Sequence, residues 1–239
     1  MFGRFLELGI ATPDIASSVL HYERLGFSQL ITGDAFSHRY GVLSDGRVPL
    51  GLHQRDMPSP TLTFVLPQLW LAQQGLRERR FVPEMAQFGE DALHQLRLRD
   101  PGGHAITLLE ARTYSPADRG VHAASLCGYF SHLSLPQPDF HSARDFWERA
   151  GFVALQQEAA PFAHLPLTSD HLDLAFHAPQ IFDAPLLIFE CADLTAVRSR
   201  LSALNVPMAV RLPRGMDPRA GVLLQAPEGT AALVLAATD

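Results

Sequence analysis

The feature that most constrains this chain is an internal repeat that covers a strand-like segment, a capped helix and the end of that helix. Residues 7–27 and 132–152 align without gaps, so that positions 7, 14 and 26 fall on positions 132, 139 and 151 at a constant offset of 125. In both copies an apolar run leads to a Pro-Asp pair, and the following segment ends in an aromatic-Glu-Arg-x-Gly-Phe motif. A period this long indicates that a whole small domain was duplicated. The 239-residue chain is therefore predicted to contain two related halves.

Within each half, apolar periodicity and turn residues predict the same series of elements twice. For the first half we expect a helix after Asp14, a helix at 69–80, and strands at 5–11, 27–31, 38–43, 48–54, 62–66, 85–88, 92–98 and 105–110. For the second half we expect helices at 139–150 and 194–204, and strands at 130–135, 153–158, 161–167, 172–177, 185–191, 207–212, 220–225 and 230–236. Each half then holds two β-α-β-β-β modules, and the chain holds four.

The boundaries of these modules follow from the turns and from the mixed segment that connects the halves. We predict a first domain at 1–111, with modules at 1–56 and 57–111, and a second domain at 128–239, with modules at 128–182 and 183–239. Residues 112–127 are of mixed composition with Ser, Pro, Gly and Asp among them, and are predicted to be the linker.

Charge and hydropathy exclude several classes of partner. The net charge of -6 opposes approach to nucleic acid or to an anionic membrane. No segment approaches the roughly 20 apolar residues of a membrane span, so we expect a cytoplasmic protein, either a monomer or a homodimer. The two cysteines, Cys127 and Cys191, are too few for a disulfide framework and are predicted to be buried apolar residues.

The basic residues give a further exclusion, because all 19 of them are arginine and the chain has no lysine. Schiff-base catalysis, pyridoxal phosphate attachment, Ser-Lys dyads and the phosphate-binding P-loop all require a lysine. The motifs Gly-x-Ser-x-Gly, His-Glu-x-x-His and Gly-x-Gly-x-x-Gly are absent as well.

The module itself carries a resemblance. An apolar strand, a Pro-Asp cap, a helix ending in Gly-Phe and three further strands, together with the Asp-Pro-Gly-Gly turn at 100–103, resemble the vicinal oxygen chelate superfamily. This superfamily includes glyoxalase I, bleomycin and fosfomycin resistance proteins and extradiol dioxygenases. The resemblance implies an α+β fold in which four βαβββ modules pair into two domains, each a curled mixed sheet around a cleft.

The resemblance also implies where a metal ion would be bound in the metal-using members. Their ligands come from the first strand of each module and from the last strand of a module, where alternating side chains meet in the cleft. In this chain the first-strand position holds Glu7 or His132 in modules one and three. The remaining family positions hold residues that are poor ligands: Thr61, Thr107, Leu186 and Leu233. Each half thus keeps one of three family ligands, which indicates a degenerate metal site.

A shifted set of ligands stays possible. Asp173 and His177 share one face of a strand and could join His132, and His53 in the first half could join Glu7. Each residue also has a simpler interpretation. His132 is then a core or cleft histidine held by a hydrogen bond, and His53 and His177 lie on the surface. Glu7 is either a carboxylate on the cleft floor or a side chain that points to solvent from an edge strand.

These observations lead to three functional hypotheses. The first is metal-independent binding of a small, partly apolar molecule in a cleft, with no cofactor. The second is a divalent-metal-dependent lyase or dioxygenase with a shifted ligand set, and the third is a structural or regulatory protein whose clefts are filled. The candidate catalytic residues are Glu7 and His132. The candidate ligand-binding residues are Thr61, Thr107, Asp173 and Phe176, and the metal ligands, if an ion binds, are His132, Asp173 and His177.

Overall fold

The computed structural model describes residues 2–32, 36–90, 93–111, 125–209 and 212–237. In the first half, helices α1 and α2 accompany eight strands: β1 Arg4–Ala11, α1 Ile15–Arg24, β2 Ser28–Leu30, β3 Tyr40–Ser44, β4 Pro49–His53, β5 Thr61–Leu66, α2 Leu69–Glu78, β6 Met85–Gln87, β7 Gln95–Arg99 and β8 Ala105–Glu110. In the second half, helices α3 and α4 accompany seven strands: β9 Tyr129–Pro136, α3 Phe140–Ala150, β10 Val153–Ala154, β11 His164–Thr168, β12 Leu174–His177, β13 Leu186–Cys191, α4 Leu194–Ala203, β14 Gly221–Gln225 and β15 Ala231–Ala236.

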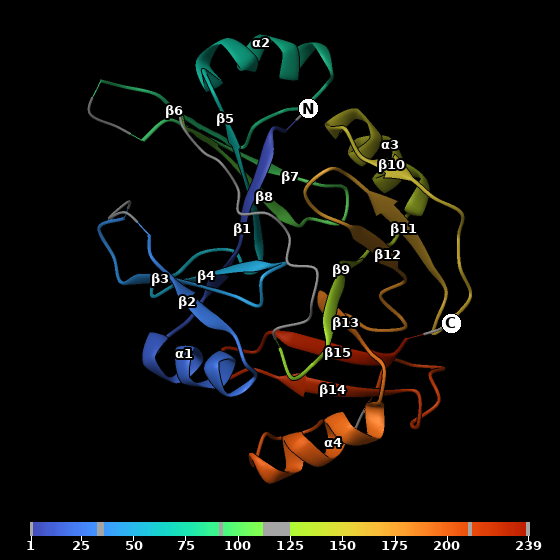
Figure 1. Cartoon of the computed structure of the whole chain (residues 1–239). Helices are drawn as coiled ribbons and strands as arrows, with labels where there is room; N and C mark the ends of the chain where they lie inside the picture. Colours follow the sequence, from blue (N-terminus) through green and yellow to red (C-terminus); the bar gives the residue numbers. More distant parts are fainter. Residues whose placement is uncertain (1, 33–35, 91–92, 112–124, 210–211, 238–239) are drawn as a thin grey trace.

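The strands of each half form one mixed sheet, and the helices lie at the periphery of the molecule (Figure 1). The first sheet has the order β2-β3-β4-β1-β5-β8-β7-β6, and the second has the order β10-β11-β12-β9-β13-β15-β14. In each sheet the two modules meet where their first strands pair antiparallel, β1 with β5 and β9 with β13. Both sheets are open and end in edge strands. The predicted α+β fold of four modules in two mixed sheets is confirmed, but the sheets are not curled as the resemblance implied.

The repeated Pro-Asp pair begins a helix in both halves for the same reason. Asp14 and Asp139 have extended backbones, and their side chains accept hydrogen bonds from the first-turn N–H groups of Ala16 and His141. This satisfies backbone donors that have no partner within the helix. At the other end, Gly151 adopts a left-handed conformation with φ of 112°, which a residue with a Cβ adopts only with strain. The duplicated motif therefore fixes both ends of the helix.

The two halves share one apolar core. Phe2 from the start of the chain packs on Trp147 of α3, and Phe27 packs on Phe189 of β13. A single cluster of buried apolar residues includes these rings and extends through both sheets. Folding of one half therefore buries apolar surface of the other.

Polar contacts between the halves follow the repeat. Helix α1 contacts the last hairpin turn of the second half, where Ser18 and Tyr22 each donate a hydrogen bond to the Glu228 carboxylate at 2.7 Å. Helix α3 contacts the corresponding turn of the first half, where the Trp147 indole donates to Asp100 at 3.2 Å. Tyr22 and Trp147 are equivalent positions of the repeat. Each helix is therefore tied to the opposite half.

Several sequence predictions differ from the structure or lie outside it. The strand predicted at 207–212 is absent from the described residues. Met208 makes only an isolated bridge to Leu224, because Pro207 lacks the N–H that a continuing ladder needs. Residues 112–124 of the predicted linker lie outside the described residues, and the domain boundaries stay a prediction.

Two further expectations concern burial and membrane segments. Both cysteines are buried, as predicted. Among the described residues no helix is long and apolar enough to cross a membrane.

Candidate functional site

The first sheet encloses a cavity of about 120 Å³ on the face that carries Glu7. We call this cavity the Glu7 pocket. It is lined by side chains from β1, β4, β5, β7 and β8 and from the segments beside them: Glu7, Phe36, His53, Arg55, Met57, Pro58, Thr61, Thr63, Glu84, Gln95, Arg97, Leu98, Arg99, Ala105, Ile106, Thr107 and Leu109. The sequence candidates Glu7, Thr61 and Thr107 thus lie in one cavity.

The strand register explains why these residues meet. Glu7 pairs with Thr63, Thr63 pairs with Thr107, and Thr107 pairs with Arg97. Residues paired across neighbouring strands point to the same face of a sheet. The four side chains therefore form one row from β1 to β7 across the floor of the pocket.

Glu7 is the most buried charged side chain of the pocket, with 2% of its surface exposed. Its Oε2 accepts a hydrogen bond from the Tyr40 hydroxyl at 2.5 Å, and its Oε1 lies 2.9 Å from Nε2 of His53. Tyr40 and His53 are cross-strand partners on β3 and β4. A buried carboxylate requires such partners, because desolvation of an unpaired charge costs several kcal/mol.

Gly51 makes room for this carboxylate. A Cβ on Gly51 would collide with the carboxylate group of Glu7, because that group lies directly over the backbone of β4. Gly9, the partner of Gly51 on β1, also lacks a side chain. The pair of glycines thus opens the floor of the sheet beside Glu7.

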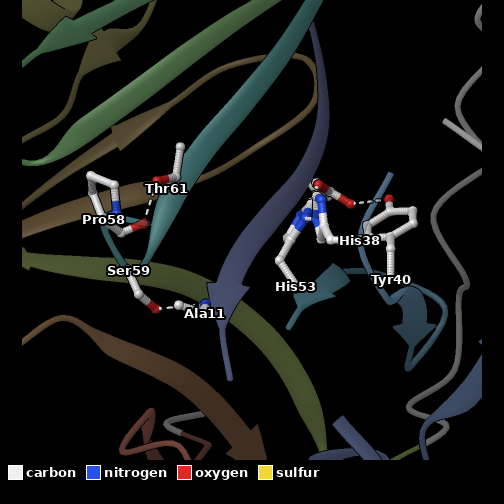
Figure 2. Close-up of polar contacts among 8 residues, drawn as sticks. Ala11, His38, Tyr40, His53, Pro58, Ser59 and Thr61 are labelled. Carbon is white, nitrogen blue, oxygen red and sulfur yellow. Dashed lines mark hydrogen bonds and ion pairs between the residues drawn. The ribbon is translucent and has the colours of Figure 1, made fainter. Parts of the chain in front are cut away.

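The hydrogen bonds continue from Glu7 through His53 to His38. Nδ1 of His53 lies 2.9 Å from Nε2 of His38, and Figure 2 shows the side chains of His38, Tyr40 and His53 converging. With Glu7 ionised, His53 donates from Nε2 and accepts at Nδ1 from Nε2 of His38. Burial lowers the pKa of His38, and the nearby His53 and Arg55 lower it further, which favours the neutral ring that this arrangement needs.

Three residues of this network were missed from the sequence. Phe36, His38 and Tyr40 were not predicted to belong to it. The Phe36 ring packs against the rings of Tyr40 and His53, with centroid distances of 4.7 and 5.1 Å. A hairpin register counted outward from the predicted turn at 44–46 would have placed Tyr40 opposite Leu50, whereas the observed register pairs Ser44 with Pro49 and Tyr40 with His53. His53 itself is 4% exposed, so the interpretation as a surface residue is wrong.

Thr61 and the segment before it complete one wall of the pocket. The Thr61 hydroxyl donates to the carbonyl of Pro58 at 2.6 Å, and the Ser59 hydroxyl accepts from the N–H of Ala11 at 3.1 Å (Figure 2). The segment that joins the two modules of the first half is thereby fixed to the end of β1.

In the second half, the equivalent face of the sheet is filled by its own side chains. The positions that match Thr61, Thr63, Thr107 and Arg97 are all apolar and belong to a second buried cluster: Leu186, Ile188, Leu233 and Leu223. Phe162 and Met216 pack into the same cluster, with Ile181, Phe182 and Leu212 beside it. The cavity of the first half therefore has no counterpart at this place in the described part of the second half.

His132 lies beside this filled face, in a depression that also includes His164 and Asp173. Its ring stacks on His164 with a centroid distance of 6.0 Å, and its Nδ1 lies 3.1 Å from the Ser131 hydroxyl. Burial, followed by the neighbouring His164 and His177, lowers the pKa of His132 to about 3. The ring is therefore neutral at physiological pH.

The other candidates of the second half are engaged in structural contacts. His177 is fully buried, so its interpretation as a surface residue is wrong. Its Nδ1 lies 2.7 Å from the Ser134 hydroxyl and its Nε2 lies 2.9 Å from the Phe182 carbonyl. Asp173 accepts a hydrogen bond from the Thr168 hydroxyl at 2.7 Å. Phe176 packs on Phe140 of α3, on the side of the sheet opposite to the pocket face.

The donor sets do not fit a divalent metal ion. Catalytic metal centres use three or more protein ligands around one point. Among the described residues no group of three or more His, Cys, Asp or Glu side chains is arranged in this way. Glu7 and His53 form a pair of donors, and both nitrogens of His177 already have protein partners.

The arrangement of strands and modules defines the class of fold. It is the two-domain fold of the extradiol dioxygenases in the vicinal oxygen chelate superfamily, so the predicted resemblance is confirmed for the fold. Catechol 2,3-dioxygenase is 14% identical, with a TM-score of 0.62 over 98% of this chain and 88% of that one. A variant of homoprotocatechuate 2,3-dioxygenase from Brevibacterium fuscum is 14% identical, with a TM-score of 0.63 over 99% and 71% of the two chains.

The same enzyme from Arthrobacter globiformis is 15% identical, with a TM-score of 0.62 over 98% of this chain and 80% of that chain. At this level of identity the similarity concerns the fold alone. No protein-family model and no curated protein sequence matches the chain.

Proposed function

We propose that the first half binds a small, partly apolar molecule in the Glu7 pocket without a metal ion, and that the second half is a structural support. The contrast between the two sheets carries this proposal. The same face of the same fold is a cavity in the first half and a packed apolar cluster in the second. A packed apolar face is sufficient for a stable sheet of this fold. A cavity lined by polar groups at the same place therefore indicates ligand binding.

The lining of the Glu7 pocket suits such a molecule. Met57, Ile106 and Leu109 offer apolar surface, and Glu7 offers a carboxylate whose orientation is fixed by Tyr40. Ligand pockets commonly combine apolar walls with a few fixed polar groups. A hydroxyl or N–H of the ligand would donate a hydrogen bond to the Glu7 carboxylate.

The proposal is tested by converting the first pocket to the composition of the second. In the variant Thr63→Ile/Thr107→Leu, two pocket residues become those found at the matching positions Ile188 and Leu233. Binding of aromatic fragments, followed by saturation-transfer NMR, is expected in the wild type and lost in the variant. A variant with Ser131→Ala, at the depression beside His132, serves as the control. Fragments that bind the wild type and the double variant equally would overturn the proposal.

The divalent-metal-dependent dioxygenase or lyase is the second candidate. Two observations favour it: the fold shared with the dioxygenases and the adjacent donors Glu7 and His53. Metal analysis of protein purified without chelators separates the two candidates. A stoichiometric ion that is lost in Glu7→Ala or His132→Ala would establish a metal site, and its absence from protein that still binds fragments would support metal-independent binding.

A further inference from the structure

The charges around the Glu7 pocket point to the chemical class of its ligand. Three arginines and two glutamates line the pocket. Arg99 is neutralised locally, since its Nε lies 2.8 Å from the Glu84 carboxylate and its guanidinium also donates to the Gly103 carbonyl. Glu7 is held by Tyr40 and His53. Arg55 is exposed at the rim.

Arg97 differs from the other arginines of the pocket. It is half-buried on β7, and within the described part of the chain its guanidinium makes no hydrogen bond or ion pair with a protein group. A half-buried cation loses hydration without compensation unless an anion or water replaces it. The five N–H donors of a guanidinium fit a carboxylate in a bidentate geometry.

The position of Arg97 relative to Glu7 sets the length of the site. Both residues belong to the row that crosses β1, β5, β8 and β7, with Thr63 and Thr107 between them. Three strand spacings separate the first backbone from the last, which is about 14 Å. The Glu7 carboxylate lies over β4, on the other side of β1, so a ligand contacts both ends only if its body crosses the row past Thr63 and Thr107.

The fold does not require an arginine here. In the second half the position paired with Leu233 holds Leu223, which is 5% exposed and packs in the filled cluster. An apolar residue at this place of the β-sheet is therefore compatible with the module. Within the described residues the guanidinium of Arg97 has no hydrogen-bond or ion-pair partner, and a ligand would give it one.

We infer that the ligand of the Glu7 pocket is an organic monoanion whose carboxylate is bound by Arg97 and whose body extends toward Glu7. This inference rests on the proposed binding function. A dianionic phosphate fits less well, because the buried Glu7 carboxylate also lines the pocket and would repel the second charge.

The test compares two probes of equal shape, benzoate and benzamide, on three proteins. The variants are Arg97→Gln and Arg77→Gln, the latter an exposed arginine of α2 that loses the same charge outside the pocket. We expect Arg97→Gln to weaken benzoate binding about tenfold or more, since the lost contact is charge-assisted, and to leave benzamide binding unchanged. Arg77→Gln should behave like the wild type with both probes.

The outcomes separate this inference from the proposed function. If both probes bind equally and Arg97→Gln affects neither, the assignment of the ligand as a monoanion is overturned and the proposed binding function stands. Benzoate binding that persists in Thr63→Ile/Thr107→Leu, or no binding of either probe, would overturn both. Displacement of benzoate by inorganic phosphate at lower concentration than by acetate would overturn the assignment to a carboxylate.

Discussion

Gly51 offers the sharpest test of the Glu7 network, because a single added methyl group would disrupt it. A Cβ at this position would occupy the place of the Glu7 carboxylate, so Gly51→Ala has to move that group away from Tyr40 and His53. Each of the two hydrogen bonds involves a charged group and contributes roughly 1.5 kcal/mol or more, so we expect a loss of about 3 kcal/mol. For a protein of this size that lowers the melting temperature by about 6–12 °C.

The assay is thermal unfolding at pH 7, followed by circular dichroism, with Gly41→Ala as the matched control. Gly41 lies on the neighbouring strand β3, and a Cβ there would meet only Ile15 at 4.0 Å. A second comparison removes the carboxylate first. In a Glu7→Ala background, Gly51→Ala should lower the melting temperature far less, because the added methyl group no longer collides with a carboxylate. The effects of the two substitutions on stability should therefore be strongly non-additive. Equal melting temperatures for Gly51→Ala and Gly41→Ala, or additive effects in the cycle, would refute this explanation of Gly51.

The remaining predictions concern pH and the contact between the halves. Burial lowers the pKa of His177 to about 4 and that of His132 to about 3, so the unfolded chain binds more protons and stability falls as the pH drops below about 6.5. His132→Gln should reduce this slope by about 1.4 kcal/mol per pH unit between pH 4.5 and 6 in urea titrations, and an unchanged slope would contradict the buried neutral ring. Tyr22→Phe leaves Glu228 with one hydrogen bond fewer and should lower the free energy of unfolding by about 1–3 kcal/mol in the same assay. An unchanged value would show that the contact between α1 and the second half contributes nothing to stability.

Much of the fold could be predicted because the duplicated segment carries local signals. The Asp14 and Asp139 caps and the Gly151 helix end act within a few residues, so their effect can be read from the sequence. The prediction of a strand at 207–212 was wrong, and the reason is partly local. Pro207 interrupts a ladder that apolar periodicity alone would extend.

The site was less predictable, because it depends on register between strands. Glu7, Thr61 and Thr107 were identified from positions in the module, and the structure brings all three to one pocket. Phe176 was proposed together with His177, although neighbouring residues of a strand face opposite sides of the sheet. Strict alternation would have excluded one of the two.

The role of Arg97 and the filled face of the second sheet could be recognised only from the tertiary structure. The sequence shows threonines in one half and leucines at the matching positions of the other, but both patterns are compatible with a strand. The packed face of the second sheet becomes visible only when Ile188 is seen to pair with Leu233, beside Leu223. The pocket of the first sheet, with a cation at its end, becomes visible only from the row that runs from Glu7 to Arg97.

The most direct test is a crystal structure of the protein grown with benzoate, with anomalous data collected for transition metals. We predict benzoate in the Glu7 pocket, with its carboxylate against Arg97 and no anomalous peak beside Glu7, His53 or His132. The apolar cluster around Leu233 should remain closed. Benzoate bound beside His132 with the Glu7 pocket empty, or a metal ion bound by Glu7 and His53, would contradict metal-independent binding in the first half.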